Sequence, residues 1–168
     1  SKNSPDVMIP AFLAAYTGKS ADNVSLDLFP NLLSLMPNWR ITYGGLSRLD
    51  WFKNRFKSFN LNHAYRSTYS VGSYNTYQSF TSYMNNLGFV EDTQTGNPTP
   101  SAVFDIGTVA INEQFAPLFG VDMTFKNGIT TKVEYKKTRI LTLSMTANQI
   151  VETSSKDFVV GMGYKIVD

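Results

Sequence analysis

Few side chains in this sequence have the type and spacing that catalysis or metal binding requires. His63 is the only histidine and there is no cysteine, so a Ser-His-Asp triad or a zinc site would have to form around a single ring. The chain contains neither a Gly-x-Ser-x-Gly motif nor two histidines spaced four residues apart. We therefore interpret His63 as a structural or interfacial residue, and we predict no metal site.

Carboxylates are the remaining candidates for acid–base chemistry. The candidate carboxylates are Asp105, Asp122, Glu134 and Glu152. Asp122 has a simpler role as the neighbour of Lys132 across a hairpin, and Glu134 is typical of a solvated or pore-facing charge. The sequence therefore predicts a protein that is not an enzyme and that uses no cofactor.

Basic and aromatic residues are interleaved in the segment from Arg48 to Lys57. Such a segment can bind nucleic acid or anchor a helix at an anionic membrane surface. The net charge is only +2, which is too small to suggest a nucleic-acid-binding protein. We favour the membrane interpretation, and the predicted interface anchors are Trp39, Trp51, Phe52 and Phe56.

The chain lacks the apolar run of roughly 20 residues that a membrane-spanning helix needs, whereas a membrane-spanning strand needs only about 9–11 residues. It begins at Ser1 with no signal-peptide pattern, and we expect a mature piece or an internal fragment of a longer protein.

The first hundred residues divide into three predicted segments. Residues 1–37 contain four prolines and are expected to be an irregular loop, with some local helix at the short apolar clusters. Residues 38–74 alternate apolar with polar side chains at both ends and predict strand–helix–strand, with Ser47 or Asp50 as the helix cap. Residues 75–100 are polar and predict a long loop containing a helical turn.

Residues 101–168 predict an antiparallel meander. A strand is expected over residues 102–112, and four strands with clear alternation follow: 119–125, 129–135, 141–145 and 158–166. Connections are expected near residues 137–139 and 153–155.

Parity constrains these connections, because residues that face each other across a hairpin share a face of the sheet. The first two of the four strands place their apolar residues at odd positions, so their loop must have an odd number of residues. A three-residue loop, Lys126-Asn127-Gly128, with Gly128 in the left-handed conformation satisfies this. The connection near residues 137–139 must also be odd, and the last must be even, because the apolar set becomes even at Phe158.

Alternation does not say which face is covered. A soluble sandwich or small barrel turns its apolar face inward, whereas a membrane barrel turns it outward and keeps a polar lumen. Polar faces rich in Thr, Ser and paired charges, and aromatic residues near strand ends, favour the membrane barrel.

Particular runs of residues resemble one family. They are PNWRITY at 37–43, LNHAYRSTYSVGS at 61–73, PLFGVDMTFKN at 117–127 and FVVGMGY at 158–164. In these runs the chain resembles a C-terminal part of the SprA/Sov family, the outer-membrane translocon of the type 9 secretion system of Bacteroidota, which is also tied to gliding motility.

The resemblance implies that residues 1–168 are one segment of a large transmembrane β-barrel in the bacterial outer membrane. Folded client proteins with a C-terminal signal would pass through its pore. The implied partners are outer-membrane lipids, these clients, a smaller outer-membrane barrel that acts as a shuttle, and a periplasmic plug protein; the family carries no catalytic residues. The alternative that remains is a soluble or peripheral β-barrel or sandwich that serves as a binding or adhesion module.

The barrel interpretation assigns two sets of residues. The predicted lipid-facing set is Phe119, Val121, Met123, Phe125, Val133, Tyr135, Leu141, Leu143, Val160 and Met162. The predicted pore-facing set is Asp122, Thr124, Lys132, Glu134, Thr142 and Ser144.

Overall fold

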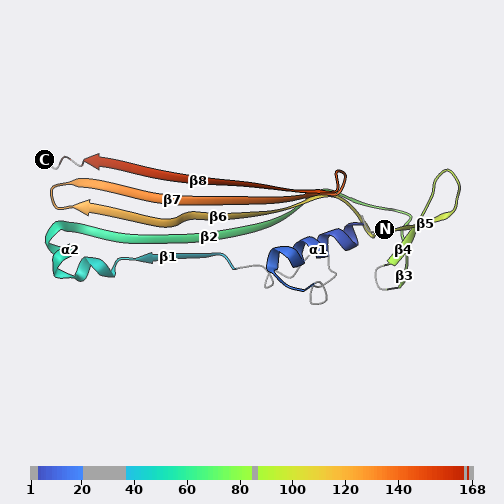
Figure 1. Ribbon diagram of the computed structural model, residues 1–168, viewed down its shortest axis with the longest axis horizontal. Helices are drawn as coiled ribbons and strands as arrows, with labels where there is room; N and C mark the ends of the chain where they lie inside the picture. The colour runs from blue at the N-terminus through green and yellow to red at the C-terminus, as the bar shows by residue number, and fades with distance from the viewer. Residues whose placement is uncertain (1–3, 21–36, 85–86, 165, 167–168) are drawn as a thin grey trace. The chain divides into compact units, whose positions relative to one another are not determined.

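The computed structural model describes residues 4–20, 37–84, 87–164 and 166. Its main sheet has five strands in the order β1-β2-β6-β7-β8 (Figure 1). Their bounds are β1 Trp39–Tyr43, β2 Phe56–Thr76, β6 Phe104–Phe125, β7 Ile129–Ser144 and β8 Gln149–Tyr164. The β1–β2 pair is antiparallel, and β6, β7 and β8 follow one another through short turns. The prediction of an all-β antiparallel meander is confirmed.

The segment from 38 to 74 forms strand, helix and strand as predicted. A 3-10 turn, η3 (Gly45–Arg48), and a short helix, α2 (Asp50–Arg55), separate β1 from β2. The predicted cap is wrong, because Leu49 occupies the N-cap position and no side chain caps the helix. The Ser47 hydroxyl instead bonds to the backbone of Phe59, donating to its carbonyl oxygen and accepting from its N–H, both at 3.1 Å.

Residues 75–100 differ from the predicted loop with a helical turn. They contain two short strands, β3 (Thr81–Met84) and β4 (Leu87–Glu91), and lead into a third, β5 (Pro98–Ser101). These strands pair antiparallel in the order β3-β4-β5. These strands pair through backbone groups, and the segment is polar. It therefore has no clear apolar alternation from which the strands could be predicted.

The local helix expected at the first apolar cluster of residues 1–37 is present as α1, Pro5–Thr17, and it is longer than the cluster. Proline at its first position is favourable, because that residue has no helical partner for an N–H group. Gly18, with φ +67°, ends the helix in the left-handed conformation. Pro10 lies inside the helix, so this proline does not end the helix, although prolines often do. The second predicted apolar cluster, at residues 26–36, lies outside the described residues.

Two connections are not where alternation placed them. The predicted strands 102–112 and 119–125 are one strand, β6, and the expected connection at 137–139 lies within β7. The predicted loop at 153–155 lies within β8, and the turn is at residues 145–148 instead. This turn has an even number of residues, as parity requires. Polar residues on both faces of a strand interrupt alternation without interrupting the backbone ladder.

The three-residue turn between β6 and β7 is confirmed. β6 ends at Phe125 and β7 begins at Ile129. Gly128 has φ +87°, and its N–H group donates to the Phe125 carbonyl oxygen at 3.2 Å. The Asn127 side chain accepts from the Ile129 N–H group at 3.2 Å. Glycine tolerates this conformation because it has no Cβ.

The chain forms two compact units. Unit 1 comprises the described residues within 1–35, 69–111 and 141–152, and unit 2 comprises those within 36–68, 112–140 and 153–168. In unit 1, α1 contributes Ile9, Phe12 and Leu13 to an apolar core. The sheet residues of that core are Ile106, Val109, Ile111, Leu141 and Leu143.

This core corrects part of the predicted lipid-facing set. Leu141 and Leu143 are both buried in the cluster to which α1 contributes. The alternation correctly placed them on an apolar face, but nothing in it indicated that the helix α1, from residues 1–37, would share this core. The prediction that these two leucines face lipid is therefore wrong.

Candidate functional site

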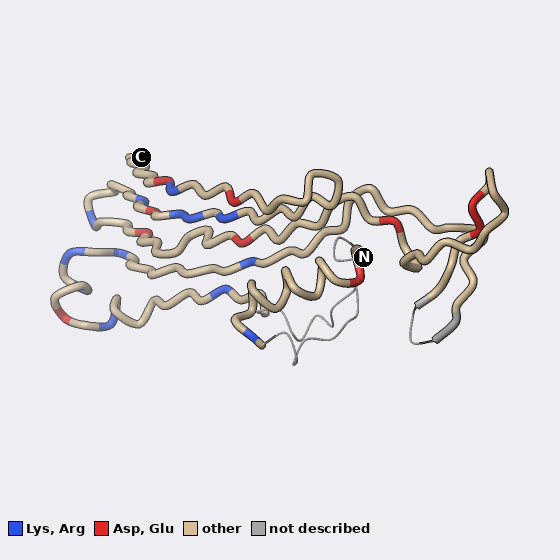
Figure 2. Tube along the Cα trace, turned by 45° about the vertical axis from the view of Figure 1, so that its right-hand side comes forward, with Lys and Arg blue, Asp and Glu red and all other residues tan. Residues whose placement is uncertain are grey.

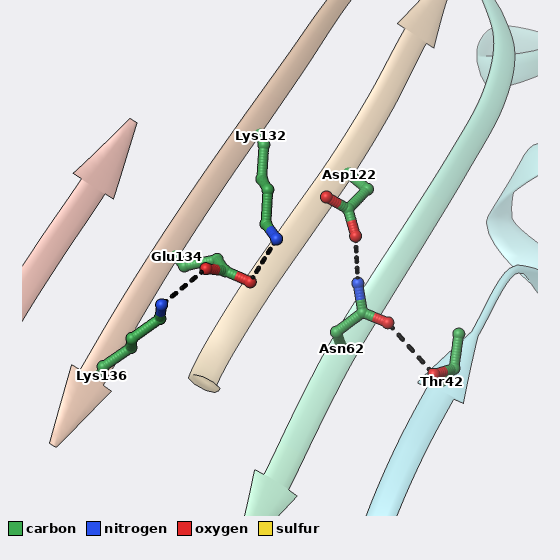
Figure 3. Close-up of polar contacts among 6 residues, drawn as sticks. All are labelled: Thr42, Asn62, Asp122, Lys132, Glu134 and Lys136. Atoms are coloured by element: carbon green, nitrogen blue, oxygen red, sulfur yellow. Dashed lines mark hydrogen bonds and ion pairs between the residues drawn. The ribbon is translucent and has the colours of Figure 1, made fainter. Parts of the chain in front are cut away.

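Unit 2 carries a line of charged side chains on β7 (Figure 3). Lys132, Glu134 and Lys136 occupy alternate positions of one strand, so they project from the same face of the sheet. Lys132 Nζ lies 2.9 Å from Glu134 Oε1, and Lys136 Nζ lies 3.2 Å from Glu134 Oε2. The Glu134 side chain is buried between two lysines that are more exposed. Each carboxylate oxygen therefore has its own cation.

A second row of polar contacts crosses three neighbouring strands. The Asn62 side-chain amide of β2 donates to Asp122 Oδ2 of β6. The Thr42 hydroxyl of β1 donates to Asn62 Oδ1 at 3.1 Å. Figure 3 shows Asn62 between these two partners. The hydrogen-bonding groups of this face thus satisfy one another across the strands.

The sequence predicted that Asp122 lies opposite Lys132. The structure places both side chains around one open hollow of about 400 Å³ in unit 2. The ion pair of Lys132 is with Glu134, and the hydrogen bond of Asp122 is with Asn62. The prediction that the two residues are neighbours is confirmed, because both line this hollow.

Glycines of β8 form one side of this hollow. Gly161 and Gly163 line it together with Thr124 and Thr130. The Thr130 hydroxyl donates to the Gly163 carbonyl oxygen at 3.2 Å. A Cβ atom on Gly163 would lie 2.8 Å from the Thr130 hydroxyl oxygen. The hollow therefore brings together three predicted pore-facing residues: Asp122, Thr124 and Lys132.

Of the three remaining predicted pore-facing residues, Glu134 is paired with Lys132, and the other two lie elsewhere. Thr142 and Ser144 belong to unit 1, at the end of β7, and both are half-buried. Ser144 Oγ accepts from the Ala147 N–H group at 3.2 Å. Ser144 thus stabilises the turn between β7 and β8. The carboxylates Asp105 and Glu152 also belong to unit 1, whereas Asp122 and Glu134 belong to unit 2.

Sequence analysis missed a polar group around Glu113. The hydroxyl of the buried Tyr65 donates to Glu113 Oε1 at 2.8 Å, and Arg139 Nη1 lies 3.6 Å from Glu113 Oε2. Trp39 stacks on Tyr65 with ring centroids 4.5 Å apart, and Phe115 lies 4.8 Å from Tyr65. The only available signal was the opposite charge of Glu113 and Arg139, since Glu113 lies between two predicted strands and Arg139 lies in a predicted connection.

His63 has a structural contact. Its Nδ1 atom lies 2.6 Å from the Leu118 carbonyl oxygen. Because a carbonyl oxygen only accepts, Nδ1 must carry the proton in this contact. The ring also lies 6.2 Å from Trp39 and 6.1 Å from Phe115. These contacts link β2 to its neighbours on both sides.

Most of the predicted lipid-facing residues belong to unit 2. Phe119, Val160 and Met162 are exposed, and Met162 reaches 77%. Val121, Met123, Phe125, Val133 and Tyr135 are half-buried. Every residue of β8 is exposed, including the large side chains Phe158 and Tyr164. Apolar side chains therefore alternate along β8 with Gly161 and Gly163, and Met162 and Met123 line the hollow together with these glycines.

The predicted interface anchors fall into two groups. Trp51, Phe52 and Phe56 form one aromatic cluster on α2 and at the start of β2, with centroids 4.8 Å apart for Trp51–Phe52 and 5.9 Å for Phe52–Phe56. Trp39 belongs to the ring group of Tyr65 and His63. The structure thus assembles three of the four anchors.

No family model matches the chain, and no curated protein is significantly similar to it. In the described part of the chain, neither helix combines the length and the apolar character of a membrane-spanning helix. The described residues also contain no group of three or more acidic or histidine side chains placed to hold a metal ion.

Proposed function

We propose that this chain is a wall segment of an outer-membrane protein-conducting channel that exports folded client proteins, as in type 9 secretion and gliding motility. The observation that carries the proposal is the separation of side chains in unit 2. On β7 the charged network around Glu134 alternates with the half-buried Val133 and Tyr135, and on β8 exposed apolar residues alternate with Gly161 and Gly163. A lipid-facing side and a wet lumen require this arrangement.

The exposed apolar residues of β8 support lipid contact. Phe158, Val160, Met162 and Tyr164 occupy alternate positions and therefore share one face. In water, such an apolar row costs free energy, at roughly 25 cal/mol per Å² of surface left unburied. Hydrocarbon tails would cover this surface without a dedicated protein partner. The row spans residues 158–164 of β8, which is most of the about 9–11 residues in which a strand crosses a bilayer.

The polar face suits a surface past which other proteins move. Its charges are paired within the wall, since Glu134 holds two lysines and Asp122 is bonded to Asn62. A wall with internally satisfied charges offers few strong binding sites to a passing client. The clients with a C-terminal signal, the shuttle barrel and the periplasmic plug rest on the family resemblance, and they form part of the proposal.

A substitution pair tests the assignment of faces. We expect Val160→Arg to cost about 2–4 kcal/mol of folding free energy in a bilayer if it lies near the midplane. Thr124→Arg, on the polar hollow, should cost much less. Folding would be measured by urea titration in vesicles, and export by client secretion from cells that carry each variant. Equal tolerance of both changes would contradict the proposed faces.

A second candidate is a soluble or peripheral binding or adhesion module. The core of unit 1 favours it, because α1 and the sheet bury an apolar cluster together as soluble domains do. Vesicle flotation separates the candidates. The membrane channel predicts that the full chain floats with vesicles and needs detergent in their absence. A chain that stays in aqueous solution and does not float would support the module instead.

A further inference from the structure

Basic residues gather along the backbone at one end of unit 2 (Figure 2), and their exposed side chains form a basic surface. We call it the α2 surface; its exposed cations are Arg48, Lys53, Arg55, Lys57 and Lys126. Asp50 is the only acidic residue between positions 44 and 60. These five cations and Asp50 carry a net charge of +4, whereas the remaining ten basic and twelve acidic residues of the chain carry −2.

The tertiary structure adds the β6–β7 turn to this surface. The Lys126 N–H group donates to the Arg55 carbonyl oxygen at 3.3 Å. Next to this bond, the rings of Phe56 and Phe125 lie 4.7 Å apart. The turn and α2 are therefore held together by a backbone hydrogen bond and an aromatic contact, although about seventy positions separate them in the sequence.

Aromatic rings hold the backbone that presents these cations. Phe59 meets Phe52 at 4.8 Å and Phe56 at 5.4 Å, both edge to face. The Arg55 guanidinium lies 4.8 Å from the centre of the Trp51 ring, within the range of a cation–π contact. The cations are thus displayed on a packed support.

Large apolar side chains are exposed within the same surface. Trp51 is 56% exposed and Leu49 is 54% exposed. A site for a small anion would not need such groups, whereas tryptophan beside lysine and arginine is typical of the boundary between lipid headgroups and acyl chains. The positive charge and the exposed apolar side chains therefore both favour a lipid surface as the ligand.

We infer that the α2 surface binds anionic lipid headgroups, so that α2 and the β6–β7 turn lie at the same membrane surface. The cations meet the lipid phosphates, while Trp51 and Leu49 enter the layer just below them. The inference rests on the proposed function and deepens it, because it identifies which ends of β2, β6 and β7 lie at a membrane boundary. Each cation near an anionic surface contributes about a fivefold change in partitioning.

The test uses the full chain with Trp39→Phe, which leaves Trp51 as the only tryptophan. Its emission is followed during titration with vesicles of phosphatidylcholine, with or without added phosphatidylglycerol. We expect a blue shift of Trp51 that requires phosphatidylglycerol. In K53Q/R55Q/K57Q, the lipid concentration at half-shift should rise on the order of 100-fold. High salt should have the same effect on the parent, because the Debye length falls to about 3 Å at 1 M.

The matched control is K19Q/K137Q/K156Q, which removes the same number of charges elsewhere. The inference requires that this control keeps the parent titration. The inference is overturned if both triple variants raise the lipid concentration at half-shift equally. It is also overturned if the Trp51 blue shift does not depend on phosphatidylglycerol. Binding of a single-stranded oligonucleotide with the same loss in K53Q/R55Q/K57Q, but no response to anionic vesicles, overturns it in favour of nucleic acid.

Flotation of the parent distinguishes this inference from the proposed function. Flotation with both kinds of vesicle, with Trp51 unresponsive to phosphatidylglycerol, contradicts only the headgroup site. Flotation with anionic vesicles alone, lost in K53Q/R55Q/K57Q, supports the headgroup site and contradicts barrel insertion. Flotation with neither contradicts both.

Discussion

Arg139 of β7 lies beside Glu113 of β6, with Nη1 3.6 Å from Oε2, while the other carboxylate oxygen of Glu113 accepts from Tyr65 at 2.8 Å. This group joins three adjacent strands of unit 2 at side chains that are mostly withdrawn from solvent. Arg139 also lies at residues 137–139, where the sequence pattern had predicted a connection instead of a continuous β7. The ion pair therefore explains how a charged stretch remains within a continuous strand.

We expect Glu113→Leu to destabilise the protein by about 1–3 kcal/mol, because the buried Tyr65 hydroxyl loses this acceptor. Tyr65→Phe should cost less, since Glu113 keeps its contact with Arg139. The double variant should show a coupling of about 0.5–1.5 kcal/mol in urea unfolding. Strict additivity of the two changes would mean that this hydrogen bond contributes nothing.

The core of unit 1 makes a contrasting prediction for two aliphatic side chains. Leu143 is 2% exposed in the cluster that includes α1, whereas Ile150 on β8 is 56% exposed. Leu143→Ala should cost about 2–5 kcal/mol, because it removes packed methyl groups and leaves a cavity. Ile150→Ala should stay within about 0.5 kcal/mol. Equal losses in the free energy of unfolding would show that α1 does not cover Leu143 in solution.

The β6–β7 turn predicts a difference between two glycines. Gly128 has φ +87°, so Gly128→Ala should destabilise the hairpin by about 1 kcal/mol or more. Gly161→Ala is the control, because its Cβ would meet only Lys132 Cβ at 3.8 Å, an ordinary contact. Thermal unfolding measures both. A neutral Gly128→Ala would rule out the left-handed turn.

The β4–β5 turn should respond to acid. The backbone N–H groups of Gln94 and Thr95 donate to Asp92 Oδ1 and lower the pKa of this carboxyl below its ordinary value of 3.8. A lowered folded-state pKa means that the contribution is present above pH 3.8 and is lost as the pH falls through the folded pKa. Amide exchange at Gln94 and Thr95, corrected for intrinsic rates, should therefore accelerate at low pH.

Asp92→Asn provides the comparison for this acid response. The amide oxygen still accepts a hydrogen bond, but the side chain no longer titrates. Its corrected exchange at Gln94 and Thr95 should not vary across the same pH range. A variant that keeps the acid response would assign the titration to another group.

Local rules were sufficient where neighbouring residues decide the structure. Alternation predicted β1 and β2, and parity predicted the odd turn closed by Gly128 and an even turn before β8. Both follow from the two-residue period of a strand, which belongs to the chain itself. The same period grouped Lys132 with Glu134, and Asp122 with Thr124, as members of one polar face.

Contacts between distant segments decided the rest. The sequence alone determined an antiparallel all-β chain with alternating faces and a glycine turn. Only the tertiary structure showed that α1 shares a core with Leu141 and Leu143, that Asp122 bonds to Asn62, and that Lys126 joins α2. Periodicity states that a face is apolar or polar, but it contains no information about which distant segment covers that face. Packing against a partner from elsewhere in the chain supplies that information, because burial depends on three-dimensional neighbours.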